Sequence, residues 1–291
     1  HSDRRRWNHR LGGMEGVDNM NVTELLEMAR GNITVFDSIA KAHHVLITHD
    51  NIAVSISGGS DSDVVLDLIY KVNQTTQKNI HWVWFDTGLE YQATKQHLEF
   101  LEKKYNITIK RQKAVKPIPL SCRQHGQPFL NKFVSEQMGR LQKNGFQWED
   151  EPLEVLYSKY PICKSALKWW TNQYTIENNF KTVSRFDIGY NKWLKEFIIA
   201  NPPQFNIANK CCTYAKKNVA KKFNKENGID CVIIGIRRAE GGIRSTIYKN
   251  CFSKCETKTD QYRPMFWYSD MDKIDYERAF GVTHSDCYVK Y

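Results

Sequence analysis

The chain has 291 residues, of which 41% are hydrophobic, enough for one substantial core or a core with an elaborated insert. No run approaches the roughly 20 apolar residues that a membrane span requires, so we expect a soluble protein without a membrane partner. The formal net charge is +10, to which four arginines and one aspartate before Met14 contribute +3. The remaining excess suits a polyanionic ligand such as a nucleotide or nucleic acid, but a lysine-rich solvated surface explains it equally well.

The N-terminal stretch, residues 1–19, is charged and lacks the apolar segment of a secretory signal. We interpret it as tag or vector residues and a disordered start, with a native start at Met14 or Met20. Eight cysteines without a secretory signal argue against a disulfide framework. They favour a cytoplasmic protein with a metal or cluster site, or with reactive thiols. Cys231, inside an apolar run, is instead expected to be a buried core thiol.

Alternating elements begin after a helical stretch at about 20–47. A short apolar run, 51–57, predicts a strand that ends in Gly58-Gly59, and helical periodicity follows over 63–72. A strand, a glycine-rich turn and a helix in this order open a βαβ unit.

The next segments continue this alternation. A second strand is predicted at 80–85, directly before Asp86-Thr87-Gly88, then a helix at 94–104 and a third strand at 107–111. Strands and helices in alternation predict an α/β fold with a doubly wound, mostly parallel, Rossmann-like sheet. Ligands of such sheets bind beyond the carboxyl ends of the strands, where both glycine-containing turns lie.

Residues from about 120 to 210 interrupt the alternation. Helical patches occur there without a clear strand, at 130–141, 165–180 and 191–200. We interpret the segment as a helical insert in a single domain of residues 20–291. The alternation resumes with a helix at 212–227 and a strand at 231–235. The stretch from Tyr262 onward is only weakly periodic.

The turn Ser57-Gly58-Gly59-Ser60-Asp61-Ser62 has the composition of a phosphate-binding loop. Its glycines allow a close backbone approach, and the first turn of the following helix points N–H groups and the positive end of the helix dipole at a ligand. The three serines add hydroxyl donors, and Asp61 can order a lysine, a water or Mg²⁺. An ordinary strand-to-helix turn with a serine cap is the alternative. Three serines around Gly-Gly favour phosphate, and no Walker A motif occurs.

Three motifs carry a family resemblance. Ser57 to Ser62 matches the S-G-G-x-D-S signature of PP-loop ATP pyrophosphatases, and Asp86-Thr87-Gly88 resembles the D-T-G segment of the phosphoadenosine phosphosulfate (PAPS) reductase family. The stretch from Gly235 to Arg244 is similar to that family's G-x-R-x-x-E-S-x-x-R loop. The order of the motifs is also the family's, which implies the adenine nucleotide alpha-hydrolase fold.

The resemblance implies roles for individual residues. It puts the loop from Ser57 to Ser62 on phosphates, and Asp86 and Gly88 near the nucleoside. Arg237 and Arg244 would contact phosphate or sulfate oxygens, a task that suits the planar guanidinium. Asp61, Arg237 and Arg244 are therefore the predicted catalytic residues, and Gly235 belongs to the nucleotide site. Where the family has serine after the glutamate, this chain has Gly241.

Four cysteines resemble the ligand layout of a [4Fe-4S] cluster in cluster-bearing members of the superfamily. These are the adjacent pair Cys211-Cys212 and the later Cys251 and Cys255, whose C-x-x-x-C spacing is looser than the family's C-x-x-C. Four thiolates fit an iron-sulfur cluster or zinc. Cys163 is a substitute for one ligand, and scattered thiols without metal remain the alternative.

The motifs favour ATP over PAPS as the nucleotide. The loop matches the S-G-G-x-D-S signature at every position, whereas the Glu-Cys-Gly-x-His tail of family reductases does not occur. Cys287 lies instead in Ser285-Asp286-Cys287-Tyr288. This favours Mg²⁺-dependent adenylation followed by sulfur transfer, with tRNA or DNA as an acceptor. Trp169, Trp170 and Trp193 are candidates to stack on bases or, more ordinarily, to fill the core. A PAPS or adenylylsulfate reductase and a nucleotide sensor without turnover stay open, and the sequence does not set the oligomeric state.

Overall fold

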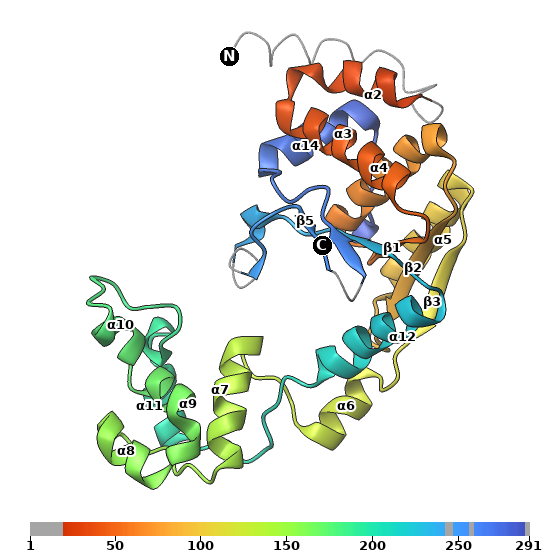
Figure 1. Cartoon of the computed structure of the whole chain (residues 1–291). Helices are drawn as coiled ribbons and strands as arrows, with labels where there is room; N and C mark the ends of the chain where they lie inside the picture. The colour runs from red at the N-terminus through yellow and green to blue at the C-terminus, as the bar shows by residue number, and fades with distance from the viewer. Residues whose placement is uncertain (1–19, 242–246, 256–258, 289–291) are drawn as a thin grey trace. The chain divides into compact units, whose positions relative to one another are not determined.

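The computed structural model describes residues 20–241, 247–255 and 259–288, which form two compact units. The first, called the sheet unit below, comprises 20–86, 90–113 and the described residues from 219 onward. The second, called the helical unit, comprises 87–89 and 114–218 and so contains the predicted insert at about 120–210. Figure 1 shows both units along the chain. That the insert belongs to a single domain stays a prediction.

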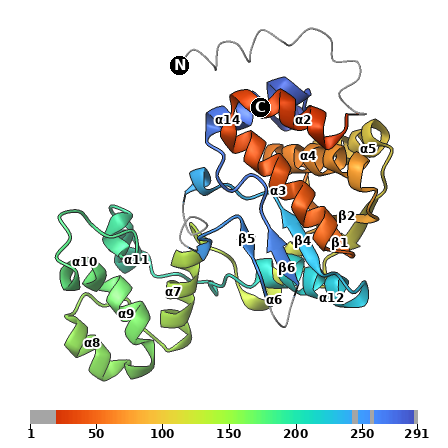
Figure 2. The same cartoon turned by 45° about the horizontal axis from the view of Figure 1, so that its top comes forward.

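The sheet unit is built on six strands in the order β3-β2-β1-β4-β6-β5. All neighbours run parallel except β5, which is antiparallel to β6 (Figure 2). The predicted α/β class with a mostly parallel sheet is confirmed. In chain order the strands are β1 (Ile52–Ile56), β2 (Ile80–Asp86), β3 (Ile109–Lys113), β4 (Cys231–Ile234), β5 (Phe252–Ser253) and β6 (Asp260–Tyr262).

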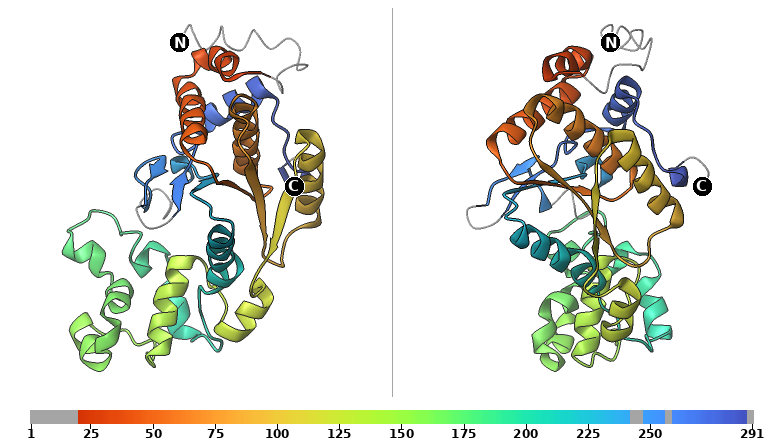
Figure 3. Two further views of the ribbon diagram at one scale, coloured as in Figure 1. Left: turned by 45° about the vertical axis from the view of Figure 1, so that its right-hand side comes forward. Right: turned by 90° about the vertical axis from the view of Figure 1, so that its right-hand side faces the viewer.

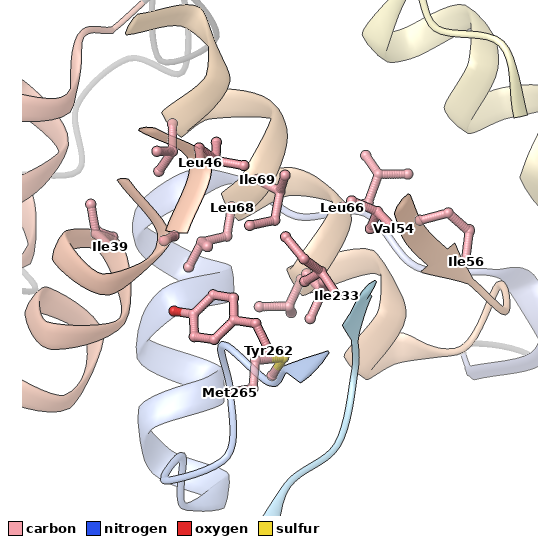
Figure 4. Packing of buried hydrophobic residues seen from close by; sticks show 14 of the residues in the cluster. Ile39, Leu46, Val54, Ile56, Leu66, Leu68, Ile69, Ile233, Tyr262 and Met265 are labelled. Carbon is pink, nitrogen blue, oxygen red and sulfur yellow. The ribbon is translucent and has the colours of Figure 1, made fainter. Parts of the chain in front are cut away.

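Helices cover both faces of the sheet, as the side-chain alternation along β1 requires. Val54 and Ile56 face the larger core, with residues from α3 (Ile33–Thr48), α4 (Ser60–Thr76), α5 (Gln92–Tyr105) and α14 (Asp270–Phe280). Figure 4 shows part of this packing. Ala53 faces the other way, in a smaller cluster with Phe223 of α12 (Asn218–Glu226), which lies on the opposite face from α4 (Figure 3). Burial on both faces explains why β1 is almost uniformly apolar.

A buried ion pair joins three of these helices. Asp67 and Lys71, one turn apart on α4, are 0% and 1% exposed and bind each other. The hydroxyls of Tyr105 on α5 and Tyr276 on α14 donate to Asp67 at 2.9 and 2.8 Å, and Lys71 Nζ donates to the carbonyl oxygen of Phe280 at 3.0 Å. Because buried charges are tolerated only when they are fully paired, this network constrains how the helices pack.

The helical unit has a core of its own. Trp169 and Trp170 are fully buried in it, so the core interpretation of these two residues holds and stacking on bases is excluded for them. Trp193 is 65% exposed. The helices are α6 (Ile118–His125), α7 (Lys132–Lys143), α8 (Leu153–Lys159), α9 (Lys164–Trp170), α10 (Gln173–Glu177) and α11 (Leu194–Ala200).

Several sequence-based boundaries differ from the structure. The helix predicted at 165–180 is two helices, because Asn172 adopts a left-handed conformation with φ 57° and breaks the chain after α9. The helix predicted at 212–227 begins as the π-helix η6 (Thr213–Lys217) before α12. The weakly periodic C-terminal stretch begins at the last residue of β6 and contains α14. At the N-terminus, α2 (Val22–Met28) and η3 (Ala29–Gly31) precede α3. In the described ranges every helix is too short or too polar to span a bilayer.

We expect Asp67→Asn to lower the free energy of unfolding by about 3–5 kcal/mol, because it leaves the Lys71 ammonium buried without its counter-charge. Urea denaturation measures the change. Asp37→Asn is the matched control: Asp37 also pairs with a lysine one turn away, Lys41, but both side chains are nearly half exposed. The control should lose at most about 0.5 kcal/mol. Equal losses in the two variants would contradict the role given to the buried network.

Candidate nucleotide site in the sheet unit

The loop Ser57–Ser62 lies between β1 and α4 and is braced from within. The Ser62 hydroxyl accepts from the Ser57 N–H at 2.8 Å, and the Ser57 hydroxyl accepts from the Gly59 N–H at 3.3 Å. Gly58 has φ 71°, and a Cβ there would lie 2.8 Å from a methyl of Thr94. The α4 helix begins at Ser60, so the first backbone N–H groups have no acceptor within the helix and face the loop opening. This is the geometry of an anion-binding helix start.

Gly235, predicted as part of the site, contacts the loop from β4's carboxyl end. A Cβ at this position would lie 3.2 Å from the backbone carbon and oxygen of Asp61 and 3.3 Å from the Ser62 nitrogen. Backbone atoms cannot swing away as a side chain can. A side chain at residue 235 would therefore push the strand end and the loop apart by a few tenths of an ångström.

Asp61 is the centre of a charged cluster. Arg237 Nε donates to Asp61 Oδ2 at 2.9 Å, and Lys273 Nζ lies 2.7 Å from Oδ1 and donates to the Ser60 hydroxyl at 2.6 Å. Burial opposes ionisation of Asp61, but hydrogen bonds from Lys273 and Arg237 outweigh it and lower the pKa of this carboxyl. Arg237 also donates to Asp270 at 2.7 Å. Two cations thus converge on the predicted phosphate loop.

A second layer of charge lies under the loop. Asp63, 1% exposed, accepts from His284 Nδ1 at 2.9 Å and lies 3.0 Å from His97 Nε2. The other ring nitrogen of His284 lies 2.9 Å from Glu277. Burial lowers the pKa of His284, but hydrogen bonds to Asp63 and Glu277 prevail and raise it to about 9. This ring is therefore an imidazolium at neutral pH.

The predicted site residues differ in how the structure places them. Ser57 to Ser62, Gly235 and Arg237 come together, which is consistent with their predicted roles. Asp86 lies at the carboxyl end of β2, beside β1, as a nucleoside contact requires. Gly88 belongs to the helical unit, with φ 83° and no room for a Cβ against Pro117. Arg244 lies outside the described residues.

Sequence reasoning missed Lys273, His284 and Glu277. Lys273 and Glu277 are one helical turn apart on α14, after the capping box of Ser269 and Asp272. That S-x-x-D pattern is a helix start signal, and it could have placed a charged helix face in this stretch.

The predicted cluster cysteines are distributed over both units. Cys211 and Cys212 lie in the helical unit, Cys251 and Cys255 in the sheet unit. Burial, with a contribution from Cys212, raises the pKa of Cys211. Among the described residues no group of three or more His, Cys, Asp or Glu side chains is placed to hold a metal. The cluster and its zinc alternative stay predictions. Cys163 is a core residue of the helical unit, and burial raises the pKa of Cys231 to about 12, as expected of an inert core thiol.

A mostly parallel sheet with a glycine-rich loop at the carboxyl end of a central strand, and cations around it, is an arrangement suited to anionic ligands such as nucleotide phosphates. Residues 51–144 match the family model described as the phosphoadenosine phosphosulfate reductase domain. The matched segment contains the loop and β2, and it is similar to the family that the motifs predicted.

Among solved structures the likeness is distant. One similar solved structure is the phosphate complex of phosphoadenylyl-sulfate (PAPS) reductase from Candida auris, with 12% identity over 92% of this chain and 91% of that one, and a TM-score of 0.47. This likeness is too distant to bear on the site. No curated protein matches the sequence.

The charge on His284 should make stability depend on pH. Its folded pKa of about 9 lies above the ordinary 6.5, so the stabilisation is complete below pH 6.5 and is lost as the pH rises through 9. The free energy of unfolding of the wild type should exceed that of His284→Gln by on the order of 2 kcal/mol at pH 6 and by much less at pH 9.5. Urea denaturation at the two pH values measures this, with the exposed His44→Gln as control. If the difference in unfolding free energy between wild type and His284→Gln is the same at both pH values, the ion pairs of His284 are not its source.

Proposed function

We propose that the chain binds ATP at the loop Ser57–Ser62 and cleaves it between the α and β phosphates to adenylate an acceptor, which a sulfur nucleophile then attacks. The observation that carries the proposal is the convergence of Arg237 and Lys273 on an intact S-G-G-S-D-S loop. Free thiols at all eight cysteines suit the reducing cytoplasm, where we place the protein.

The loop and its cations fit the charge changes of this reaction. An acceptor oxygen attacks the α phosphorus, and the bond to the β-phosphate oxygen breaks, so that negative charge accumulates on the departing pyrophosphate. The first-turn N–H groups of α4, the Arg237 fork and the Lys273 ammonium are positioned to bind such charge. In the second step sulfur displaces AMP from the adenylated acceptor. Fixed donors at the site of developing charge stabilise the transition state.

Mg²⁺ fits this site as a cation held chiefly by the nucleotide. Such ions need only one or two protein carboxylates beside the phosphates, and Asp61 is the carboxylate that the loop offers. The ion would offset charge on the leaving group. The thiols at 211, 212, 251 and 255 have the donor chemistry of a [4Fe-4S] cluster, which would supply the sulfur.

A PAPS reductase is the second candidate, and the description of the matching family model favours it. In this reaction a thiolate attacks the sulfur of PAPS, the S–O bond breaks and adenosine 3′,5′-bisphosphate leaves. A thiol of reduced thioredoxin then attacks the resulting thiosulfonate, and sulfite is released as a disulfide forms. The same loop and cations would then hold the phosphates of PAPS. The products distinguish the two candidates.

The deciding experiment is mass spectrometry of the products from two incubations of the full chain. The first contains ATP, Mg²⁺ and a panel of sulfate, tRNA and DNA; the second contains PAPS, reduced thioredoxin and no ATP. AMP and pyrophosphate in the first incubation support the proposal. Sulfite in the second supports the reductase. ATP binding without AMP or pyrophosphate would mean a nucleotide sensor and would overturn the proposed turnover.

Lys273→Met should weaken ATP binding by about tenfold, because a charge-assisted hydrogen bond to phosphate contributes roughly 1.5–3 kcal/mol, part of which Arg237 retains. Titration of a fluorescent ATP analogue measures the dissociation constant. Lys41→Met, which removes an exposed ammonium on α3, is the matched control and should bind as wild type. Unchanged binding by Lys273→Met would remove Lys273 from the site.

A further inference from the structure

The positive charge of the chain is concentrated in the helical unit. Residues 114–218 contain 15 Lys and Arg against 8 Asp and Glu, an excess of +7. With +3 before Met14, these two segments account for the whole net charge of +10, so the rest of the chain is neutral on balance. The charge is therefore carried by the helical unit and not by the sheet unit, which contains the proposed ATP loop. Such an excess favours a polyanionic ligand of the helical unit itself.

One surface of the helical unit adds exposed aromatic rings to this charge. The chain between α10 and α11 surrounds a hollow of about 640 Å³. Phe180, Phe186 and Tyr190 line it and are 54%, 40% and 61% exposed. We call this surface the aromatic hollow; Lys181 and Arg185 line it as well. Its volume is within the range of small-ligand sites, about 300–1,000 Å³, so it has room for a nucleobase.

Cations accompany the rings. The Arg185 guanidinium lies 5.1 Å from the centre of the Phe186 ring, and just beyond the hollow Lys192 Nζ lies 4.6 Å from the ring centre of Trp193. The two acidic residues between Asn172 and Trp193 are both engaged elsewhere. Glu177 binds Lys168 at 2.6 and 2.8 Å, and Asp187 is fully buried. The surface charge of this stretch is therefore positive.

The aromatic hollow is preformed. Asp187 accepts from the backbone N–H groups of Tyr174 and Thr175 at 3.1 and 2.7 Å, and from the Thr175 hydroxyl at 2.6 Å. The same hydroxyl accepts from the Ser184 N–H at 2.8 Å. These bonds hold the segment in place while its rings remain exposed. A rigid surface loses little entropy when it binds a ligand.

We propose that the aromatic hollow binds single-stranded nucleic acid, with bases stacked on Phe180 and Tyr190 and phosphates paired with Lys181, Arg185 and Lys192. Stacking platforms interleaved with cations are how proteins bind unpaired strands. The hydroxyl and amide groups of Thr182 and Asn178, which also line the hollow, can donate to base edges. The proposal names the acceptor class of the proposed function and rests on that function only in this respect.

Fluorescence anisotropy of the full chain with labelled 12-mers of oligo(dT) and oligo(U) tests the proposal without ATP. The double variant Phe180→Ala/Tyr190→Ala should weaken binding about tenfold or more, since two stacked bases are lost. Tyr157→Ala is the matched control, because Tyr157 is also exposed in the helical unit, on α8, with Lys164 Nζ 4.9 Å from its ring centre. It should bind as wild type. Circular dichroism verifies that both variants fold.

Two further measurements vary the salt concentration and replace the oligonucleotide by other ligands. Lys181→Gln should reduce the slope of log affinity against log salt concentration by about 0.7, the value for one phosphate contact on a single strand. Equal affinity of the double variant and wild type would overturn the proposal. So would equal affinity for a DNA duplex, or binding to phosphatidylserine vesicles without oligonucleotide binding. Because pyrophosphate release from ATP is assayed separately, failure of this surface and failure of the ATP site are distinguishable.

Discussion

The buried carboxylate of Asp67 is the interaction on which the sheet unit depends. It accepts from one lysine and two tyrosines that come from three helices, and none of these groups can leave without exposing an unpaired charge or hydroxyl to the core. Its own helix, α4, carries the phosphate loop at its start. Its partner helix α14 carries Lys273. The position of Lys273 relative to the loop is thus set one to two helical turns away, by this buried network.

At the loop, too, carboxylates hold cationic side chains in position. Asp61 holds Arg237 and Lys273, and Asp63 holds His284. Carboxylates that bind cations in this way keep those side chains ordered. In the proposed function, a phosphate that enters would exchange one set of ion pairs for another with little rearrangement of the protein. Such preorganisation is where much of the electrostatic part of catalysis originates.

The sheet and the loop were predictable because their signals are local and apolar. The β1 strand is almost wholly apolar, and Ser57 to Ser62 follows it directly. The α14 helix was not predictable in this way, because its buried face is partly polar: Asp272 and Asp275 are both buried and accept hydrogen bonds from Asn32. Hydrophobic periodicity detects only apolar helix faces, so it does not reveal a helix whose buried face is partly polar.

In the helical unit, the sequence did not reveal which aromatic side chains are buried and which are exposed. A lysine lies within two residues of both Trp170 and Trp193 in the sequence, yet Trp170 is buried and donates to the Glu149 carbonyl oxygen while Trp193 is exposed. Only tertiary packing separates a core ring from a surface ring. The aromatic hollow was missed for a related reason, because Phe180 and Tyr190 have no periodicity that sets them apart from core residues.

The close approach at Gly235 also has a consequence for how this protein can change over evolution. A Cβ at residue 235 would lie 3.2 Å from the backbone of the phosphate loop. In the helical unit, a Cβ at Gly126 or Gly139 would lie 2.5 Å from the backbone oxygen of Asn206 or Ile207. Each of these three glycines can therefore be replaced only if the facing backbone shifts, so both units contain positions at which the chain is expected to tolerate little sequence change.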